Sequence, residues 1–150
     1  MILLALALLQ AAAPTQTAMP TCTSYDAALP AALSAWTKPD TAFETFGATT
    51  LVAIDPGSVV PPQKPGKIAT VGFTIHKPGT YRVALDQPGW IDLAKASDPA
   101  PLKSIAFGHG PECSTIRKLV AYDLTVGEYM LRISGLAKPS AKVMLVEGGM

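Results

Sequence analysis

The sequence has few of the residues that enzyme sites usually require. Its 150 residues include two histidines, two cysteines and eleven carboxylate side chains. No G-x-S-x-G motif supplies a nucleophilic serine of the hydrolase type. The carboxylates are dispersed, with neither a D-x-D-x-D calcium spacing nor a pair suited to glycoside cleavage. These absences favour a protein without catalytic machinery of its own.

The chain also lacks a large excess of positive or negative charge. The net charge is +1, and the lysines and arginines are spread along the chain. A protein that neutralises a phosphate backbone usually gathers its cations in a stripe, so nucleic acid is not an expected partner. After the first nine residues, no apolar run approaches the ~20 residues of a membrane-spanning helix. We therefore expect no transmembrane segment after removal of an N-terminal signal.

The first nine residues, by contrast, are apolar without interruption. Gln10 and three alanines follow, which is the order of an export signal with its small-residue cleavage region. We expect a signal peptide over residues 1–13, with the cleavage site between 13 and 21 because Pro14 disfavours cutting after Ala13. The mature protein is then expected to be periplasmic or secreted.

Cys22 and Cys113 are the two cysteines of the chain. In an oxidising compartment we expect them to form a disulfide. Neither belongs to a C-x-x-C motif or lies beside an obvious activating base, so thiolate chemistry is not favoured. A bridge that closes a loop of about ninety residues would stabilise the fold by roughly 4 to 5 kcal/mol in the chain-entropy model.

Residues 14–49 are expected to form an N-terminal lead-in with a short helix from Pro30 to Trp36, because proline suits a first helical turn. Residues 50–146 are expected to form one domain. Its apolar residues alternate, as in Val71, Phe73 and Ile75, and turn residues separate the runs. Strands are expected at 50–54, 71–75, 81–85, 90–93, 103–107, 116–124, 129–133 and 142–146. Such short strands predict an all-β fold, an antiparallel, jelly-roll-like β-sandwich of seven to eight strands.

Two of these strands begin alike. Gly79-Thr80-Tyr81 and Gly127-Glu128-Tyr129 each place a glycine two residues before a tyrosine. The glycine can adopt the positive φ of a turn, and the tyrosine can bury its ring while its hydroxyl reaches backbone at a sheet corner. The pattern is typical of two corners of one sandwich.

Residues 68–146 resemble the pre-peptidase C-terminal type of β-sandwich found in exported bacterial proteins. The similar segments are Phe73-Thr74-Ile75, Pro78-Gly79-Thr80-Tyr81, Ile91-Asp92-Leu93 and Leu124-Thr125-Val126-Gly127-Glu128-Tyr129. The resemblance covers about half of the chain and rests on fold motifs. It implies an accessory or binding module and no particular reaction.

The chain also resembles short exported proteins with an HGP-x-C loop, here His109-Gly110-Pro111-Glu112-Cys113, that carry the name homogentisate 1,2-dioxygenase. This resemblance implies a non-heme iron enzyme that cleaves an aromatic ring. His76, His109 and Glu112 supply the composition of a two-histidine, one-carboxylate iron site. Strand alternation turns His76 away from the face of Phe73 and Ile75, so we keep the dioxygenase, with iron as its cofactor, as the alternative.

The favoured hypothesis is a small exported binding or accessory protein of the cell envelope that needs no cofactor. If Ile91 and Leu93 face the core, Trp90 and Asp92 face outward. An exposed tryptophan beside polar groups can stack on a sugar ring or anchor a protein. Arg82 and Arg132 have outward positions in their strands and add hydrogen-bond donors. The expected partner is an envelope polysaccharide or another protein.

Overall fold

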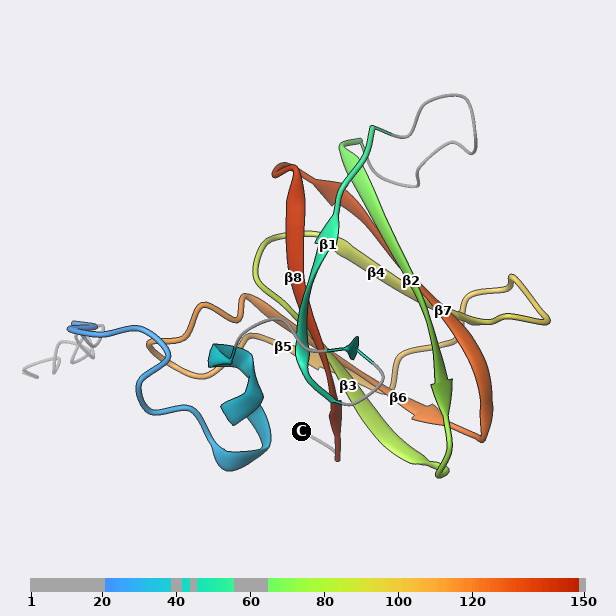
Figure 1. Ribbon diagram of the computed structural model, residues 1–150, viewed down its shortest axis with the longest axis horizontal. Helices are drawn as coiled ribbons and strands as arrows, with labels where there is room; N and C mark the ends of the chain where they lie inside the picture. Colours follow the sequence, from blue (N-terminus) through green and yellow to red (C-terminus); the bar gives the residue numbers. More distant parts are fainter. Residues whose placement is uncertain (1–20, 39–41, 44–45, 56–64, 149–150) are drawn as a thin grey trace, which may run out of the picture.

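The structure is a computed structural model that describes residues 21–38, 42–43, 46–55 and 65–148 (Figure 1). Within these ranges the chain forms two antiparallel sheets and one short 3-10 helix, which confirms the predicted all-β sandwich. The predicted signal peptide lies outside the described residues. The elements are η1 (Ala31–Thr37), β1 (Ala48–Val52), β2 (Lys67–Ile75), β3 (Gly79–Leu85), β4 (Trp90–Lys95), β5 (Ala106–Gly108), β6 (Lys118–Leu124), β7 (Gly127–Leu136) and β8 (Ser140–Glu147).

The strand order is that of a jelly roll with one change. The large sheet has the order β1-β8-β3-β6-β5, and the small sheet has the order β2-β7-β4. The pairs β1/β8, β2/β7 and β3/β6 are nested along the chain, as the two interlocked Greek keys of a jelly roll require. β5, however, pairs with β6 at the edge of the large sheet and does not extend the small sheet beyond β4. The small sheet therefore ends at β4.

The predicted strands are present with shifted ends. β1 begins at Ala48, two residues before the predicted start, and Ile54 forms an isolated bridge with Ile68. β5 is reduced to three residues. β2 and β3 follow each other across the predicted turn, but they lie in different sheets and form no hairpin. The turn at Pro78 thus carries the chain from one layer to the other.

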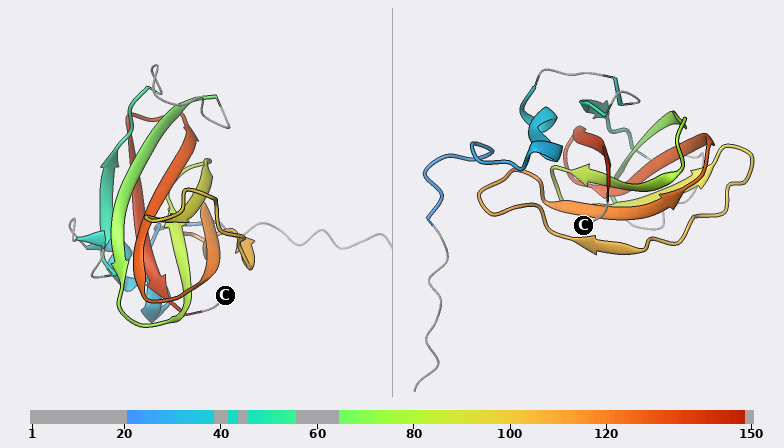
Figure 2. Two further views of the ribbon diagram at one scale, coloured as in Figure 1. Left: turned by 90° about the vertical axis from the view of Figure 1, so that its right-hand side faces the viewer. Right: turned by 90° about the horizontal axis from the view of Figure 1, so that it is seen from below.

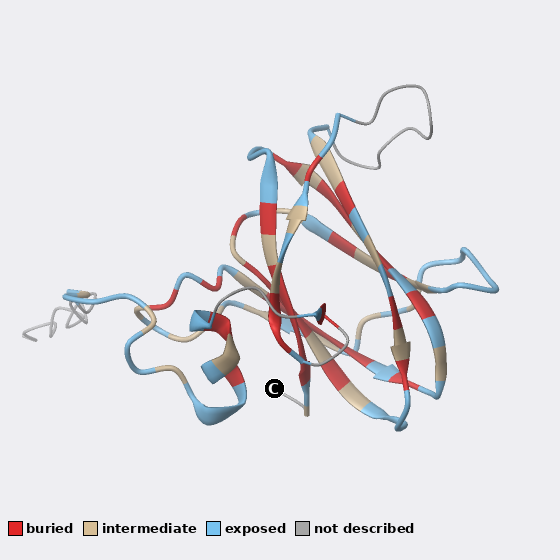
Figure 3. Cartoon of the chain, viewed as in Figure 1, coloured by how far each residue is buried: buried red, intermediate tan, exposed pale blue. Residues whose placement is uncertain are grey.

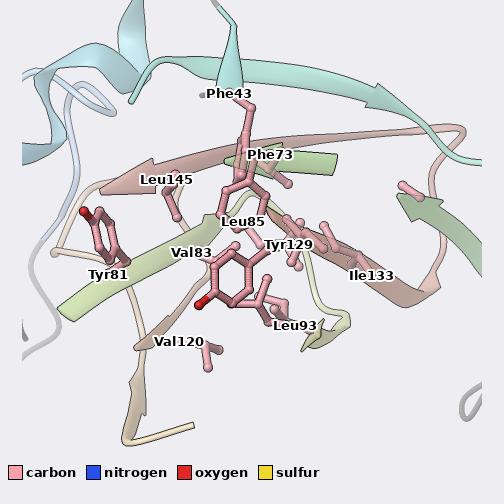
Figure 4. Close-up of a cluster of buried hydrophobic side chains, with 14 of the residues drawn as sticks. Phe43, Phe73, Tyr81, Val83, Leu85, Leu93, Val120, Tyr129, Ile133 and Leu145 are labelled. Carbon is pink, nitrogen blue, oxygen red and sulfur yellow. The ribbon is translucent and has the colours of Figure 1, made fainter. Parts of the chain in front are cut away.

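The core lies between the two sheets and is built mainly from alternate residues of β2, β3, β4, β6, β7 and β8 (Figures 3 and 4). The ring of Phe73 on β2 has its centroid 5.2 Å from that of Phe43 and 5.8 Å from that of Tyr129. Val83, Leu93 and other aliphatic side chains fill the space around these rings (Figure 4). Burial of this apolar area supplies the main stabilisation of the fold.

A second apolar cluster covers the outer face of the large sheet. η1 lies against β8 and β1 (Figure 2) and buries Leu33 and Trp36. These side chains belong to one cluster with Ala84 and Met144, which point away from the main core. The helix begins one residue later than predicted, with Pro30 as its N-cap. The short helix therefore adds a third layer, which the sequence pattern did not predict.

The predicted disulfide joins Cys22 to Cys113, 91 residues apart in the sequence. Hydrogen bonds reinforce it, because Asp26 N–H donates to the Cys113 carbonyl at 2.8 Å and the Asp26 carboxylate accepts from Thr115 N–H at 2.7 Å. Trp36 Nε1 donates to Thr115 Oγ1 at 2.8 Å. The N-terminal segment is thus fixed to the loop that leads into β6.

Both predicted tyrosine corners are present. Tyr129 Oη donates to the Thr125 carbonyl at 2.9 Å and accepts from Thr125 N–H at 3.1 Å. Tyr81 Oη donates to the carbonyl of Lys77, also four residues earlier, at 2.6 Å. The glycine prediction holds at Gly127, whose φ is +150°, and is wrong at Gly79, which does not have a positive φ. The two corners share a side-chain contact but not a backbone conformation.

Candidate functional site

The outer edge of β4 is closed by groups from elsewhere in the chain. Because β5 lies in the large sheet, no strand among the described residues pairs with this edge. Instead, the carbonyl oxygens of alternate residues accept hydrogen bonds from other parts of the chain. Lys118 Nζ donates to Gly89 O at 2.8 Å, and Tyr122 Oη donates to Ile91 O at 3.1 Å. Leu102 N–H donates to Leu93 O at 2.7 Å. An edge occupied in this way is a poor template for an added strand.

A hollow of about 250 Å³ lies beside this edge, and we call it the edge hollow. Two of its aromatic side chains reach solvent, with Trp90 44% and Phe107 78% exposed. They come from different sheets, on β4 and β5 respectively. The lining is completed by Ile91, Ser104, Lys118, Val120 and Tyr122.

The Trp90 ring is held by polar contacts while part of it remains exposed. Its Nε1 donates to Asp92 Oδ1 at 3.0 Å, and the Lys118 ammonium lies 5.4 Å from the ring centroid, within the range of a cation–π contact. As expected, Ile91 and Leu93 are buried on the opposite face of the strand. The ring is therefore oriented without being part of the core.

Burial sets the ionisation of the two polar residues from β6. It raises the pKa of Tyr122 to about 12, and the Asp92 carboxylate adds to this effect. Burial also lowers the pKa of Lys118, an effect that the Asp92 charge opposes. At neutral pH the Tyr122 hydroxyl is therefore a neutral donor to the β4 edge.

The predicted binding residues do not form one surface. Arg132 on β7 lies directly opposite Asp92 on β4, and Trp90 lies two residues from Asp92 on the same outward face. The guanidinium of Arg132 is only partly accessible, since its Nη2 is buried without a hydrogen-bond partner. Arg82 is on β3, in the large sheet. The structure therefore places three of the four residues together and Arg82 apart from them.

The residues of the alternative iron site are not gathered into a metal centre. His76 follows β2 of the small sheet and His109 follows β5 of the large sheet, and both are exposed. His109 Nδ1 lies 3.3 Å from the Arg117 carbonyl oxygen. Among the described residues, no three His, Cys, Asp or Glu side chains lie together in a way that could hold a metal ion. The hypothesis of His76, His109 and Glu112 as iron ligands gains no geometric support.

Phe107, Ser104, Lys118 and Tyr122 were not singled out from the sequence. Their strands were predicted, but the pairing of β5 with β6 was not, and this pairing brings Phe107 into the lining of the same hollow as Trp90. Comparison with known protein families, curated proteins and solved structures finds no match to this chain. The function is therefore argued from the site itself.

Proposed function

We propose that the protein is a small exported binding or accessory protein of the cell envelope, and that the edge hollow binds one ring of a polysaccharide. The proposal rests mainly on two exposed aromatic side chains, Trp90 and Phe107, which come from different sheets and line one cavity. Aromatic rings present broad apolar faces to a flat ligand at a low entropic cost of ordering.

The size and polarity of the hollow favour a sugar ring over a larger ligand. A volume of about 250 Å³ is below that of pockets that enclose drug-sized molecules, roughly 300 to 1,000 Å³. The lining combines apolar faces with the Ser104 hydroxyl and the Lys118 ammonium, which can donate hydrogen bonds to ligand hydroxyls. A partner that offers one ring at a time, as a polysaccharide does, matches this shape.

Export is supported by two separate features. The nine-residue apolar N-terminus has the composition of a signal peptide, and the disulfide between Cys22 and Cys113 suits an oxidising compartment. No helix of the described chain is both long and apolar enough to cross a membrane. The resemblance to the pre-peptidase C-terminal type of sandwich is consistent with an accessory role in such a compartment.

Affinity electrophoresis tests the binding proposal. The mature protein should migrate more slowly in gels that contain a soluble neutral polysaccharide, such as a β-glucan, a galactomannan or dextran. Trp90→Ala and Phe107→Ala should each abolish the retardation. Met130→Ala is the matched control, because Met130 is 44% exposed on the same sheet but does not line the hollow.

Two results would contradict the proposal. One is migration that none of these polysaccharides retards. The other is equal loss of retardation in Trp90→Ala and Met130→Ala, which would indicate contact with the sheet surface in general and not with the edge hollow.

A further inference from the structure

A larger, polar cavity of about 630 Å³ lies beside the turn that follows β3, and it shares no lining residue with the edge hollow. Three cationic side chains line it, Arg117, Lys138 and Lys142, against one carboxylate, Asp86. We call it the cationic cavity. Arg117 is distant in the sequence from Lys138 and Lys142, so the cluster of three exists only in the folded chain.

These cations are not neutralised by ion pairs. In the described part of the chain, salt bridges form only between Lys67 and Asp55 and between Lys77 and Glu147. The Lys142 ammonium instead lies 4.7 Å from the centroid of the Trp36 ring. Asp86 is already engaged, because its Oδ1 accepts from the Lys142 backbone N–H at 3.1 Å. The cavity therefore keeps an excess of positive charge.

A buried glutamine fixes the wall that carries the lysines. Gln87 is 2% exposed, and both ends of its amide are used. Its Nε2 donates to the Ser140 carbonyl at 2.8 Å, and its Oε1 accepts from Lys138 N–H at 3.3 Å. Together with Asp86, Gln87 ties the turn between β7 and β8 to the cavity. This wall is thus ordered before any ligand binds.

Another part of the lining depends on the N-terminal segment. Tyr25 lines the cavity and lies next to Asp26, which is bonded to Thr115 and to the Cys113 backbone. The disulfide at Cys113 holds this segment to the body of the protein. Arg117 belongs to the same loop, and its backbone N–H donates to the Leu85 carbonyl at 2.8 Å. Specific bonds therefore hold both groups of lining residues in place.

We propose that the cationic cavity is a binding site for a small, multiply charged anion that bears phosphate or carboxylate groups. The cavity volume lies within the range of small-molecule sites, roughly 300 to 1,000 Å³, and exceeds the needs of a single inorganic ion. Guanidinium and ammonium groups form charge-assisted hydrogen bonds with both kinds of anion. Ser114 and Thr115 also line the cavity, but their hydroxyls donate to the Pro111 carbonyl and to the Asp26 carboxylate, so the cationic side chains are the groups left to bind an anion.

Isothermal calorimetry with pyrophosphate and with citrate, in separate titrations at low ionic strength, tests this proposal. Wild-type protein should bind at least one of them, and the tighter binder identifies phosphate or carboxylate as the preferred group. The double variant Arg117→Gln/Lys138→Gln should bind roughly tenfold or more weakly, as expected for the loss of two charged donors. Lys95→Gln/Lys103→Gln is the control, because it removes the same charge from two exposed lysines outside the cavity.

The outcomes separate this site from the edge hollow. Trp90→Ala should leave anion binding intact even where it abolishes binding of polysaccharide. Wild-type protein that binds neither anion would overturn the proposal. So would an equal loss of affinity in the two double variants, because that would show a response to net charge alone.

Discussion

At the scale of single residues, Trp90 is the side chain on which the proposed function depends most. It is exposed, and its contacts with Asp92 and Lys118 lie outside the core. Trp90→Ala should therefore change the free energy of unfolding by less than about 1 kcal/mol, whereas truncation of a buried aromatic residue costs about 3 to 5 kcal/mol. Affinity for the polysaccharide should fall by about 2 kcal/mol or more, some 30-fold. Urea unfolding and affinity electrophoresis measure the two quantities.

Tyr122 gives the protein a specific dependence on alkaline pH. Its pKa is about 12 in the folded state and near its ordinary value of 10.0 in the unfolded state. The unfolded chain therefore loses this proton first, so the stabilisation is complete below about pH 10 and is lost as the pH rises towards about 12. Tyr122→Phe should show a smaller fall in unfolding free energy between about pH 9 and pH 11.5 than the wild type. Equal slopes in the two proteins would contradict the assigned burial.

At the scale of structural elements, the two tyrosine corners offer a matched comparison. The Tyr129 hydroxyl bonds to both the N–H and the carbonyl of Thr125, whereas the Tyr81 hydroxyl bonds to one carbonyl. Tyr129→Phe should lower the free energy of unfolding by about 1 to 3 kcal/mol, because it removes two hydrogen bonds to the Thr125 backbone, each worth about 0.5 to 1.5 kcal/mol. Tyr81→Phe should cost less. The reverse order in chemical denaturation would show that the corners do not stabilise the fold through these bonds.

The link between the N-terminal segment and the loop before β6 depends on the disulfide. Cys113→Ser should lower the free energy of unfolding by about 2 to 5 kcal/mol. A Cys22→Ser variant, which breaks the same bond from the other side, should lose a similar amount. Non-reducing mass spectrometry of the purified wild type should show one peptide pair that joins Cys22 to Cys113, and two free thiols would refute the link.

The sequence predicted the features that depend on local patterns and missed those that depend on contacts between distant segments. The alternation in Val71, Phe73 and Ile75 is a local pattern that indicates which face of a strand is buried, so the strands were predicted, although with shifted ends. The pairing of β5 with β6 and the cover formed by η1 depend on contacts between distant segments. No local pattern encodes them. For this reason Trp90 was found from the sequence and its neighbour Phe107 was not.

At the scale of the whole molecule, the two cavities both arise from long-range assembly. The edge hollow exists because β5 lies in the large sheet, and the cationic cavity exists because the N-terminal segment is tied to the loop before β6. In the second cavity, Arg117 is distant in the sequence from Lys138 and Lys142, so no sequence pattern indicated that the three would form a cluster. By contrast, His76, His109 and Glu112 could be identified in the sequence as candidate iron ligands. The fold does not bring them together in a way that could hold a metal ion.

The central claim, that the edge hollow binds a sugar ring against Trp90, is tested most directly by tryptophan fluorescence. The chain has two tryptophans, and Trp36 is completely buried while Trp90 is 44% exposed. Addition of a polysaccharide that retards the protein in electrophoresis should change the emission of the wild type. It should leave the emission of Trp90→Phe, which retains only Trp36, unchanged. An undiminished change in Trp90→Phe would contradict the claim.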